Sequence, residues 1–200
     1  MTTKFILLSA VVLLTQPTAT TAQTSRRASA PAPAATAGSR VNVPGGFSIA
    51  VPPGWGYNYL RISSMLPNRA GQDLGNQESE TFPPATPAAQ LARCNGVQLY
   101  RLADAEDQLM VFVHEATPAL TQNEFRAVLP DPSTKVRPDK AGGLPAYRAE
   151  NTAYGLTFVN VYAYHLTRRY GFTVTRSSAK IAPLQSALTQ VLASFALTRK

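Results

Sequence analysis

The chain has 200 residues, enough for one folded domain with additional segments at its ends. Its formal charge of +8 comes from 19 Lys and Arg against 11 Asp and Glu. Four of the basic residues precede residue 41, which leaves 15 against 11, a charge of +4. These basic residues do not cluster along one element, which excludes the charge pattern of a nucleic-acid-binding protein. The single cysteine, Cys94, excludes an internal disulfide and is expected as a buried thiol.

The first 40 residues are typical of an export leader followed by a tether. Phe5–Leu14 is an apolar run of ten residues, too short to span a bilayer, which takes about 20. Thr20-Thr21-Ala22 then supplies small residues for cleavage, so we predict a secretory signal peptide over residues 1–22. Residues 23–40 are rich in Ala, Ser, Pro and Thr, which predicts a disordered tether. We therefore expect a periplasmic or secreted protein with one folded domain at residues 41–200 and no transmembrane segment after cleavage.

The domain begins with two short predicted strands, a long polar connection and a short helix. Phe47–Val51 and Tyr57–Ile62 have the residue types and the spacing of strands. Ser63–Pro84 is longer than most structureless connections, so we expect a mobile or functional loop. A proline at its start and an Asn-Gly pair after its end predict a helix over Pro87–Cys94.

The middle of the chain alternates between predicted strands and charged connections. Val97–Arg101 and Gln108–Glu115 are predicted as strands around an acidic turn at Asp104–Asp107. Asp131–Asp139 is charged and interrupted by prolines, which predicts a connection. Leu144–Glu150 is the next predicted strand and leads into the longest apolar stretch of the chain.

A capping box gives the clearest local signal. Thr121 and Glu124 occupy the two positions whose side chains satisfy each other's backbone N–H groups at the start of a helix. Leu120 and Phe125 stand at the positions of the accompanying hydrophobic staple. The predicted helix is short because Pro130 ends it.

Leu156–Arg176 is predicted to form two long strands joined by a turn near Thr167-Arg168. These strands are apolar on both faces, so both faces must be covered. A last helix starts at Pro183 and carries an apolar stripe of Ile181, Leu184, Leu188, Val191, Leu192 and Phe195. The predicted fold class is α+β, with an antiparallel sheet of about six to seven strands between helical layers.

The register of the hairpin follows if Ala153-Tyr154 and Thr167-Arg168 are two-residue turns. Arg148 then lies beside Val159, which lies beside Arg176. All three share an aliphatic face with Leu144, Ala146, Val161, Ala163, Phe172 and Val174. The opposite, tyrosine-rich face carries Tyr147, Phe158, Asn160, Tyr162, Tyr164, Thr173 and Thr175.

This register predicts a small basic patch of Arg148, Arg176 and Lys180, able to take a carboxylate or phosphate of a partner. The alternative is a pair of arginines whose stems pack over the helix start and whose charged ends are solvated.

The apolar and turn pattern resembles that of the PsbP-like superfamily. The resemblance lies in Phe47–Trp55 (FSIAVPPGW), in Gly143–Tyr147 (GLPAY), in the long hairpin, and in a last helix that runs into Ala193-Ser194-Phe195. The superfamily includes the photosystem II extrinsic protein, a Ran-binding nuclear protein and exported bacterial proteins of unknown function. The resemblance implies an antiparallel sheet between helical layers, and it implies no catalytic residues. The sequence has no counterpart of any member's metal-binding or partner-binding residues, so none is carried over, and we expect no cofactor.

Two residue patterns invite catalytic interpretations. Ser177 and Lys180 have the S-x-x-K spacing of serine acyl-transfer enzymes, but the other elements of those enzymes are absent from the sequence. His114 and Glu115 are neighbours on a predicted strand and point to opposite faces, and His165 is the only other histidine. We expect both histidines to be structural, because they lack the ligand spacing by which metal sites are recognised.

The sequence favours an exported, non-enzymatic protein that presents a binding surface to a protein partner in the cell envelope. A second hypothesis is a small-ligand carrier that uses the tyrosine-rich face around Tyr147, Asn160 and Tyr162, beneath the Ser63–Pro84 loop. A third is a hydrolase built on Ser177 or His114.

Overall fold

The computed structural model describes residues 39–62, 79–115, 119–127, 129 and 131–198. The predicted signal peptide, nearly all of the tether and most of the Ser63–Pro84 loop lie outside the described residues. The chain divides into two units, Met1–Ala30 and Pro31–Lys200, and every described residue belongs to the second. Within these described ranges, no helix has the length and apolar character needed to cross a bilayer.

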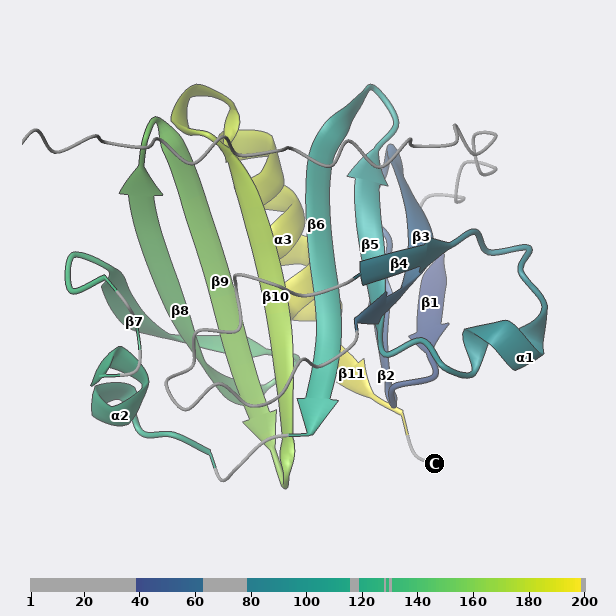
Figure 1. The fold of residues 1–200 in the computed structure, drawn as a ribbon, viewed down its shortest axis with the longest axis horizontal. Helices are drawn as coiled ribbons and strands as arrows, with labels where there is room; N and C mark the ends of the chain where they lie inside the picture. The colour runs from purple at the N-terminus through teal and green to yellow at the C-terminus, as the bar shows by residue number, and fades with distance from the viewer. Residues whose placement is uncertain (1–38, 63–78, 116–118, 128, 130, 199–200) are drawn as a thin grey trace, which may run out of the picture. The chain divides into compact units, whose positions relative to one another are not determined.

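The described unit is built on an eight-stranded antiparallel sheet with the order β4-β3-β5-β6-β10-β9-β8-β7 (Figure 1). Its strands are β3 (Trp55–Ile62), β4 (Ser79–Phe82), β5 (Gly96–Arg101), β6 (Asp104–Glu115), β7 (Lys135–Ala141), β8 (Leu144–Ala153), β9 (Leu156–His165) and β10 (Arg168–Ser177). A three-stranded sheet has the order β1-β2-β11, formed by β1 (Arg40–Val43), β2 (Phe47–Ala50) and β11 (Ala196–Leu197). The antiparallel sheet is confirmed, with eight strands in place of six to seven.

One additional strand comes from a segment that was predicted as a connection. β7 contains Pro138, which has no N–H to donate to a neighbouring strand. The strand is tolerated because it is the last in the sheet, so its proline needs a partner on one side only. The predicted acidic turn at Asp104–Asp107 is also wrong, because β6 already begins at Asp104 and the turn lies at residues 102–103.

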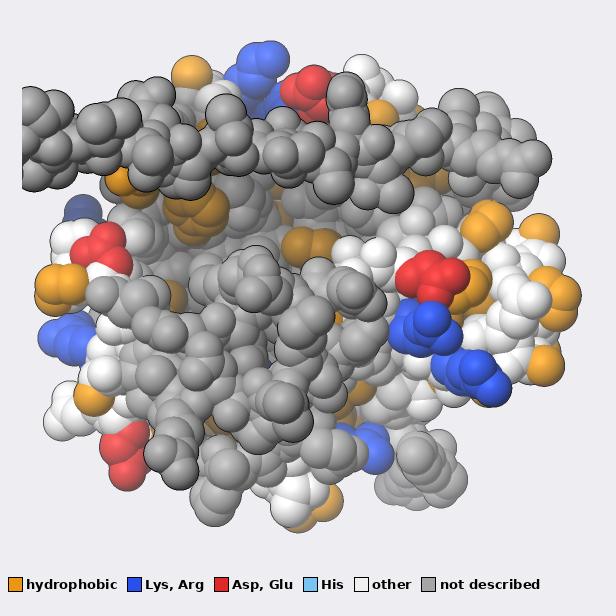
Figure 2. Space-filling view, viewed as in Figure 1, with side chains coloured by type: hydrophobic (Ala, Val, Ile, Leu, Met, Phe, Trp, Pro, Cys, Tyr) orange, Lys and Arg blue, Asp and Glu red, His pale blue; other side chains and the backbone are white. Residues whose placement is uncertain are grey.

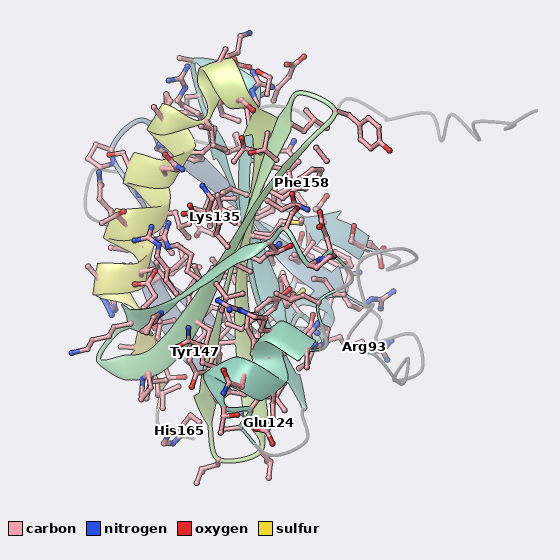
Figure 3. The ribbon with its side chains drawn as sticks, turned by 90° about the vertical axis from the view of Figure 1, so that its left-hand side faces the viewer. Arg93, Glu124, Lys135, Tyr147, Phe158 and His165 are labelled. Atoms are coloured by element: carbon pink, nitrogen blue, oxygen red, sulfur yellow. The ribbon has the colours of Figure 1, made fainter. Side chains whose placement is uncertain are left out.

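The two faces of the large sheet are covered differently. One face packs against α3 (Ala182–Ser194) and the small sheet, in a core to which α3 contributes Leu184, Ala187, Leu188, Val191 and Leu192. Figure 3 shows α3 on this side and α2 (Gln122–Ala127) on the other, near Tyr147. The third helix, α1 (Ala88–Leu91), buries no residue. The predicted helical layers are therefore reduced, in the described part, to α3 with a small sheet on one face and the short α2 on the other.

The aliphatic face is the buried one, as the alternation of the sequence predicts. Val159, Val161, Ala163, Phe172 and Val174 are at most 1% exposed, and all belong to the core that includes α3. Burial of each of the valine and phenylalanine side chains in this set contributes about 1.5–3 kcal/mol to folding. Cys94 is also buried, as expected, and burial raises the pKa of its thiol.

The predicted register is wrong by two residues at each turn. The turns lie at Tyr154-Gly155 and Leu166-Thr167, so Arg148 pairs with Val161 and Arg176 pairs with Thr157. The first turn falls there because both of its residues are left-handed, with φ of 52° at Tyr154 and 75° at Gly155, and glycine adopts such a φ without strain. A shift of two preserves the alternation, so both arginines still share the aliphatic face, but they are not neighbours across Val159.

The capping box of α2 is confirmed atom by atom. The Glu124 N–H donates to Thr121 Oγ1 at 3.3 Å, and the Thr121 N–H donates to Glu124 Oε2 at 2.7 Å. Phe125 is 4% exposed, and Leu120 packs against its cluster, which completes the staple. The packing of Phe125 against Tyr147 and Tyr162 then places α2 over the β7–β9 end of the tyrosine-rich face.

Candidate functional site

The β7–β8 hairpin is fastened to the C-terminal end of α3 at its tip. Gly142 and Gly143 form the turn, with φ of 53° and 86°. The Gly142 N–H donates to the carbonyl oxygen of Leu192 at 2.8 Å. A Cβ on Gly142 would overlap the carbonyl oxygen of Phe195, so only glycine allows this approach.

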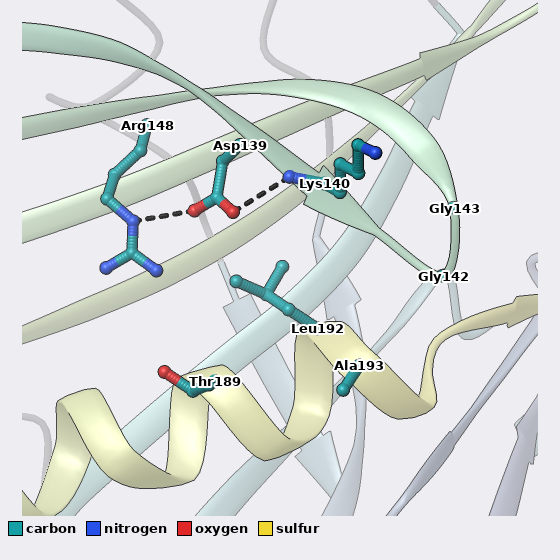
Figure 4. Close-up of a pocket in the computed structure, with 8 residues that line it drawn as sticks. All are labelled: Asp139, Lys140, Gly142, Gly143, Arg148, Thr189, Leu192 and Ala193. Atoms are coloured by element: carbon teal, nitrogen blue, oxygen red, sulfur yellow. Dashed lines mark hydrogen bonds and ion pairs between the residues drawn. The ribbon is translucent and has the colours of Figure 1, made fainter.

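A cavity of about 310 Å³ lies between this hairpin and α3 (Figure 4). Its wall combines a buried arginine and its partly exposed aspartate from the hairpin with small and aliphatic groups from the helix and the turn. The lining residues are Asp139, Lys140, Gly142, Gly143, Arg148, Thr189, Leu192 and Ala193.

Arg148 is the buried charge in this wall. It is 8% exposed, and two carboxylates hold its guanidinium in place. Its Nε–H donates to Asp139 Oδ2 at 2.7 Å, and its Nη1–H donates to Glu150 Oε1 at 3.3 Å. Asp139 is itself fixed by the backbone N–H of Lys140 at 2.8 Å. The two carboxylates compensate the charge of the buried guanidinium, and these hydrogen bonds from two directions fix its orientation.

The charges around the cavity do not cancel. Among the lining residues, Lys140 and Arg148 supply two positive charges, against one negative charge from Asp139, which leaves +1. Glu150 and Arg137 stand behind Arg148, outside the lining, and their charges cancel. The Glu150 carboxylate is shared, because Arg137 Nη2 also donates to its Oε1 at 3.2 Å. The site is therefore suited to a group of low negative charge.

Arg176 lies in a separate charge cluster, so the two arginines do not form the predicted common patch. The register sets their positions four residues apart along β9, or about 16 Å when the strand spacing is included. Arg176 binds Asp104 at 2.8 Å, Glu106 at 2.6 Å and the buried Asp107 at 3.1 Å. The hydrogen bond to Glu106 is the largest cause that raises the pKa of Arg176.

The third residue of the predicted patch, Lys180, ends the short 3₁₀ helix η1 (Ser178–Lys180) and is exposed. Figure 2 shows the face of the large sheet that lies away from α3. The coloured Lys and Arg side chains on it are scattered among acidic ones and form no broad basic area. The predicted anion site is therefore not a surface patch shared by the three residues. Of the three, only Arg148 lines the cavity.

The tyrosine-rich face packs partly under α2. Tyr147 and Tyr162 lie against Phe125, with ring centroids 5.7 Å and 5.5 Å from it. Asn160 pairs directly with Thr173 on the neighbouring strand. The side-chain oxygens of both are buried without a hydrogen-bond partner in the described part of the chain. The face is therefore core at one end and carries two unsatisfied polar atoms near its middle.

The catalytic candidates do not come together. His114 pairs with Arg169, eight residues along β10 from Ser177, which corresponds to about 26 Å. His165 pairs with Arg168 and lies on the opposite face from His114. No cluster of three metal-ligating side chains occurs among residues 39–62, 79–115, 119–127, 129 and 131–198.

No family model matches the chain, and no curated protein does. Solved structures do. The solution structure of cyanobacterial PsbP (CyanoP) from Synechocystis sp. PCC 6803 is 13% identical, with a TM-score of 0.45, over 85% of this chain and 98% of that one. It is a PsbP protein, and the sequence resembles the PsbP-like superfamily.

Two further structures are similar at a comparable level. A crystal structure from Bacteroides thetaiotaomicron is 9% identical, with a TM-score of 0.46, over 82% of this chain and half of that one. LpqN of Mycobacterium tuberculosis, described as involved in cell envelope biogenesis, is 12% identical, with a TM-score of 0.39, over 81% and 86%. At these identities and scores the likeness concerns the course of the chain and carries no statement about binding or activity.

Arg148 was identified from the sequence as a candidate site residue, but its carboxylate partner Asp139 was missed. Asp139 was assigned to a connection, because the strand character of Lys135–Ala141 is hidden by charges and a proline. The signal that could have found it is the Gly142-Gly143 pair. A two-residue turn there makes Asp139 the partner of Ala146, diagonally adjacent to Arg148.

Proposed function

We propose that the chain is an exported protein of the cell envelope that acts by binding a partner and not by catalysis. Export rests on the N-terminal pattern of residues 1–22. Binding rests on the cavity between α3 and the β7–β8 hairpin, which is the observation that carries the proposal.

The cavity supports binding because its buried donor is already oriented. A ligand that contacts Arg148 does not have to order a flexible side chain, since Asp139 and Glu150 fix the guanidinium beforehand. A site of about 310 Å³ is at the small end of the range for ligand pockets. It fits one small group, such as the end of a partner's side chain or main chain.

The separation of the catalytic candidates supports a non-enzymatic role. Nucleophilic catalysis by a serine needs a base within hydrogen-bond distance, about 2.6–3.2 Å. Ser177 is about 26 Å from His114 along the strands, an order of magnitude too far.

The experiment is site-specific photo-crosslinking in cells that export the protein. A photoreactive residue replaces Lys140 at the cavity, and the control replaces Thr175, which is exposed on the opposite face of the sheet. We expect one discrete crosslinked species from position 140 and none from position 175. No crosslink at position 140, or the same species from both positions, would contradict a partner at the cavity.

The second candidate function is the small-ligand carrier on the tyrosine-rich face. The observation that favours it is the pair of buried, unsatisfied oxygens on Asn160 and Thr173, because such atoms are costly unless a partner satisfies them. Native mass spectrometry of the exported protein tests it. A bound mass that is lost in Asn160→Leu and retained in Arg148→Lys supports the carrier. A protein that leaves the cell without a bound mass contradicts it.

A further inference from the structure

The guanidinium of Arg148 has donors that the protein does not use. An arginine has five N–H groups, and two of them are engaged by Asp139 and Glu150. Three remain without a partner in the described part of the chain. Figure 4 shows the end of the guanidinium pointing into the space between the hairpin and α3. The side chain is thus buried against the protein and presents its remaining donors to the cavity.

We propose that the cavity binds a monoanionic carboxylate that carries a small aliphatic group. This inference rests on the proposed function, because it names the ligand class of the same site. A carboxylate matches the planar end of a guanidinium and accepts two of its N–H groups at once.

The charge of the wall favours a single negative charge over two. Asp139 and Glu150 already stand against the same guanidinium, and the three charged residues that line the cavity, Asp139, Lys140 and Arg148, sum to only +1. A dianion such as phosphate would gain from Arg148 and lose by repulsion from the two acids. A monoanion brings the site close to neutrality.

The rest of the wall favours an aliphatic group beside the charge. Leu192, Ala193 and the two glycines of the turn supply an apolar side. The one hydroxyl, Thr189 Oγ1, donates to the Gln185 carbonyl oxygen at 2.9 Å and can then only accept. Besides the two cations, Arg148 and Lys140, the lining side chains offer no hydrogen-bond donor, so the wall favours an anion over a sugar or another polyhydroxy ligand.

The test is an NMR titration of the ¹⁵N-labelled exported protein with matched acids and amides. Butanoate and butanamide have the same size and shape, but the amide is neutral and carries an NH2 donor in place of one oxygen. Acetyl-Gly-Val is used with a free and with an amidated C-terminus. We expect saturable shifts of the Arg148 Nε–H and the Gly143 N–H with the acids, and a response to the amides weaker by about tenfold or more. A response to butanoate assigns a free acid, and a response to the peptide acid alone assigns the end of a chain; both support the carboxylate.

Two results would overturn the inference. Equal responses to acid and amide would show that the charge is not recognised. A response to inorganic phosphate as strong as that to butanoate would show an unspecific anion site.

Variants on α3 locate the binding without disturbing Arg148. Ala193 is exposed and lines the cavity, so Ala193→Trp fills the space from the outside. Ser186→Trp is the control, because Ser186 is exposed on the same helix seven residues and about 10 Å away and does not line the cavity. We expect at least about tenfold weaker carboxylate binding in Ala193→Trp and none of that loss in Ser186→Trp. Unchanged binding in Ala193→Trp would place the carboxylate elsewhere and end the inference.

The outcomes separate this inference from the binding role. Crosslinks from position 140 without carboxylate binding would refute the carboxylate as the ligand and would support the protein partner. Carboxylate binding without crosslinks would support a free carboxylic acid as the ligand and would refute the protein partner.

Discussion

Replacing Gly142 by alanine tests how the hairpin is fastened to α3. Two costs follow from the structure. The first is a left-handed backbone at φ 53°, which costs an L-residue about 1–2 kcal/mol. The second is the overlap of the new Cβ with the carbonyl oxygen of Phe195, which forces the hairpin tip away from the helix. That movement breaks the hydrogen bond from the Gly142 N–H to Leu192, a further loss of about 1 kcal/mol.

Gly143→Ala is the matched control. Its φ of 86° carries the same kind of backbone cost, but a Cβ there has nothing within 4 Å. We therefore expect Gly143→Ala to lower the free energy of unfolding by about 1–2 kcal/mol and Gly142→Ala to lower it by about 2–3 kcal/mol. The difference between the two variants isolates the contact with α3.

Urea unfolding followed by circular dichroism measures the free energy of unfolding of both variants. The comparison requires that its dependence on urea concentration is the same in the two. In a thermal scan, a difference of about 1 kcal/mol corresponds to about 2–4 °C for a domain of this size. Equal losses in the two variants would refute the reasoning, because they would leave only the backbone term and no contact between Gly142 and α3.

Three further predictions concern other parts of the chain. Thr121→Ala should lower the free energy of unfolding by about 1 kcal/mol, and an unchanged urea midpoint would show that α2 does not depend on the cap. The hydrogen bonds from Thr121 lower the pKa of Glu124 in the folded state, so this cap stabilises above the ordinary glutamate range and the loss in Thr121→Ala should shrink as the pH falls below about 4. The exported protein should begin at Gln23, and an intact mass that retains Phe5–Leu14 would contradict the signal peptide. Ser177 should not react with a serine-directed probe, and labelling that disappears in Ser177→Ala would reopen the hydrolase hypothesis.

The sequence by itself determined the features that depend on atoms close together in the chain. The capping box at Thr121 and Glu124 needs only four residues, and the structure reproduces both of its hydrogen bonds. The stripe of α3 and the alternation in β9 and β10 follow the periods of helix and strand, so the buried face was predicted correctly. Even the wrong register kept Arg148 and Arg176 on one face, because an error of two residues preserves the alternation.

Only the tertiary structure decided which residues meet. β7 was hidden, because charges and Pro138 are allowed in a strand that pairs on one side only, and its place at the edge is a property of the whole sheet. The turn at Tyr154-Gly155 displaced the register, which separated Arg148 from Arg176 and gave each its own acidic partners. The cavity depends on Gly142 and Leu192, fifty residues apart, meeting through one hydrogen bond. Such contacts arise from the packing of whole elements, and local sequence patterns do not specify that packing.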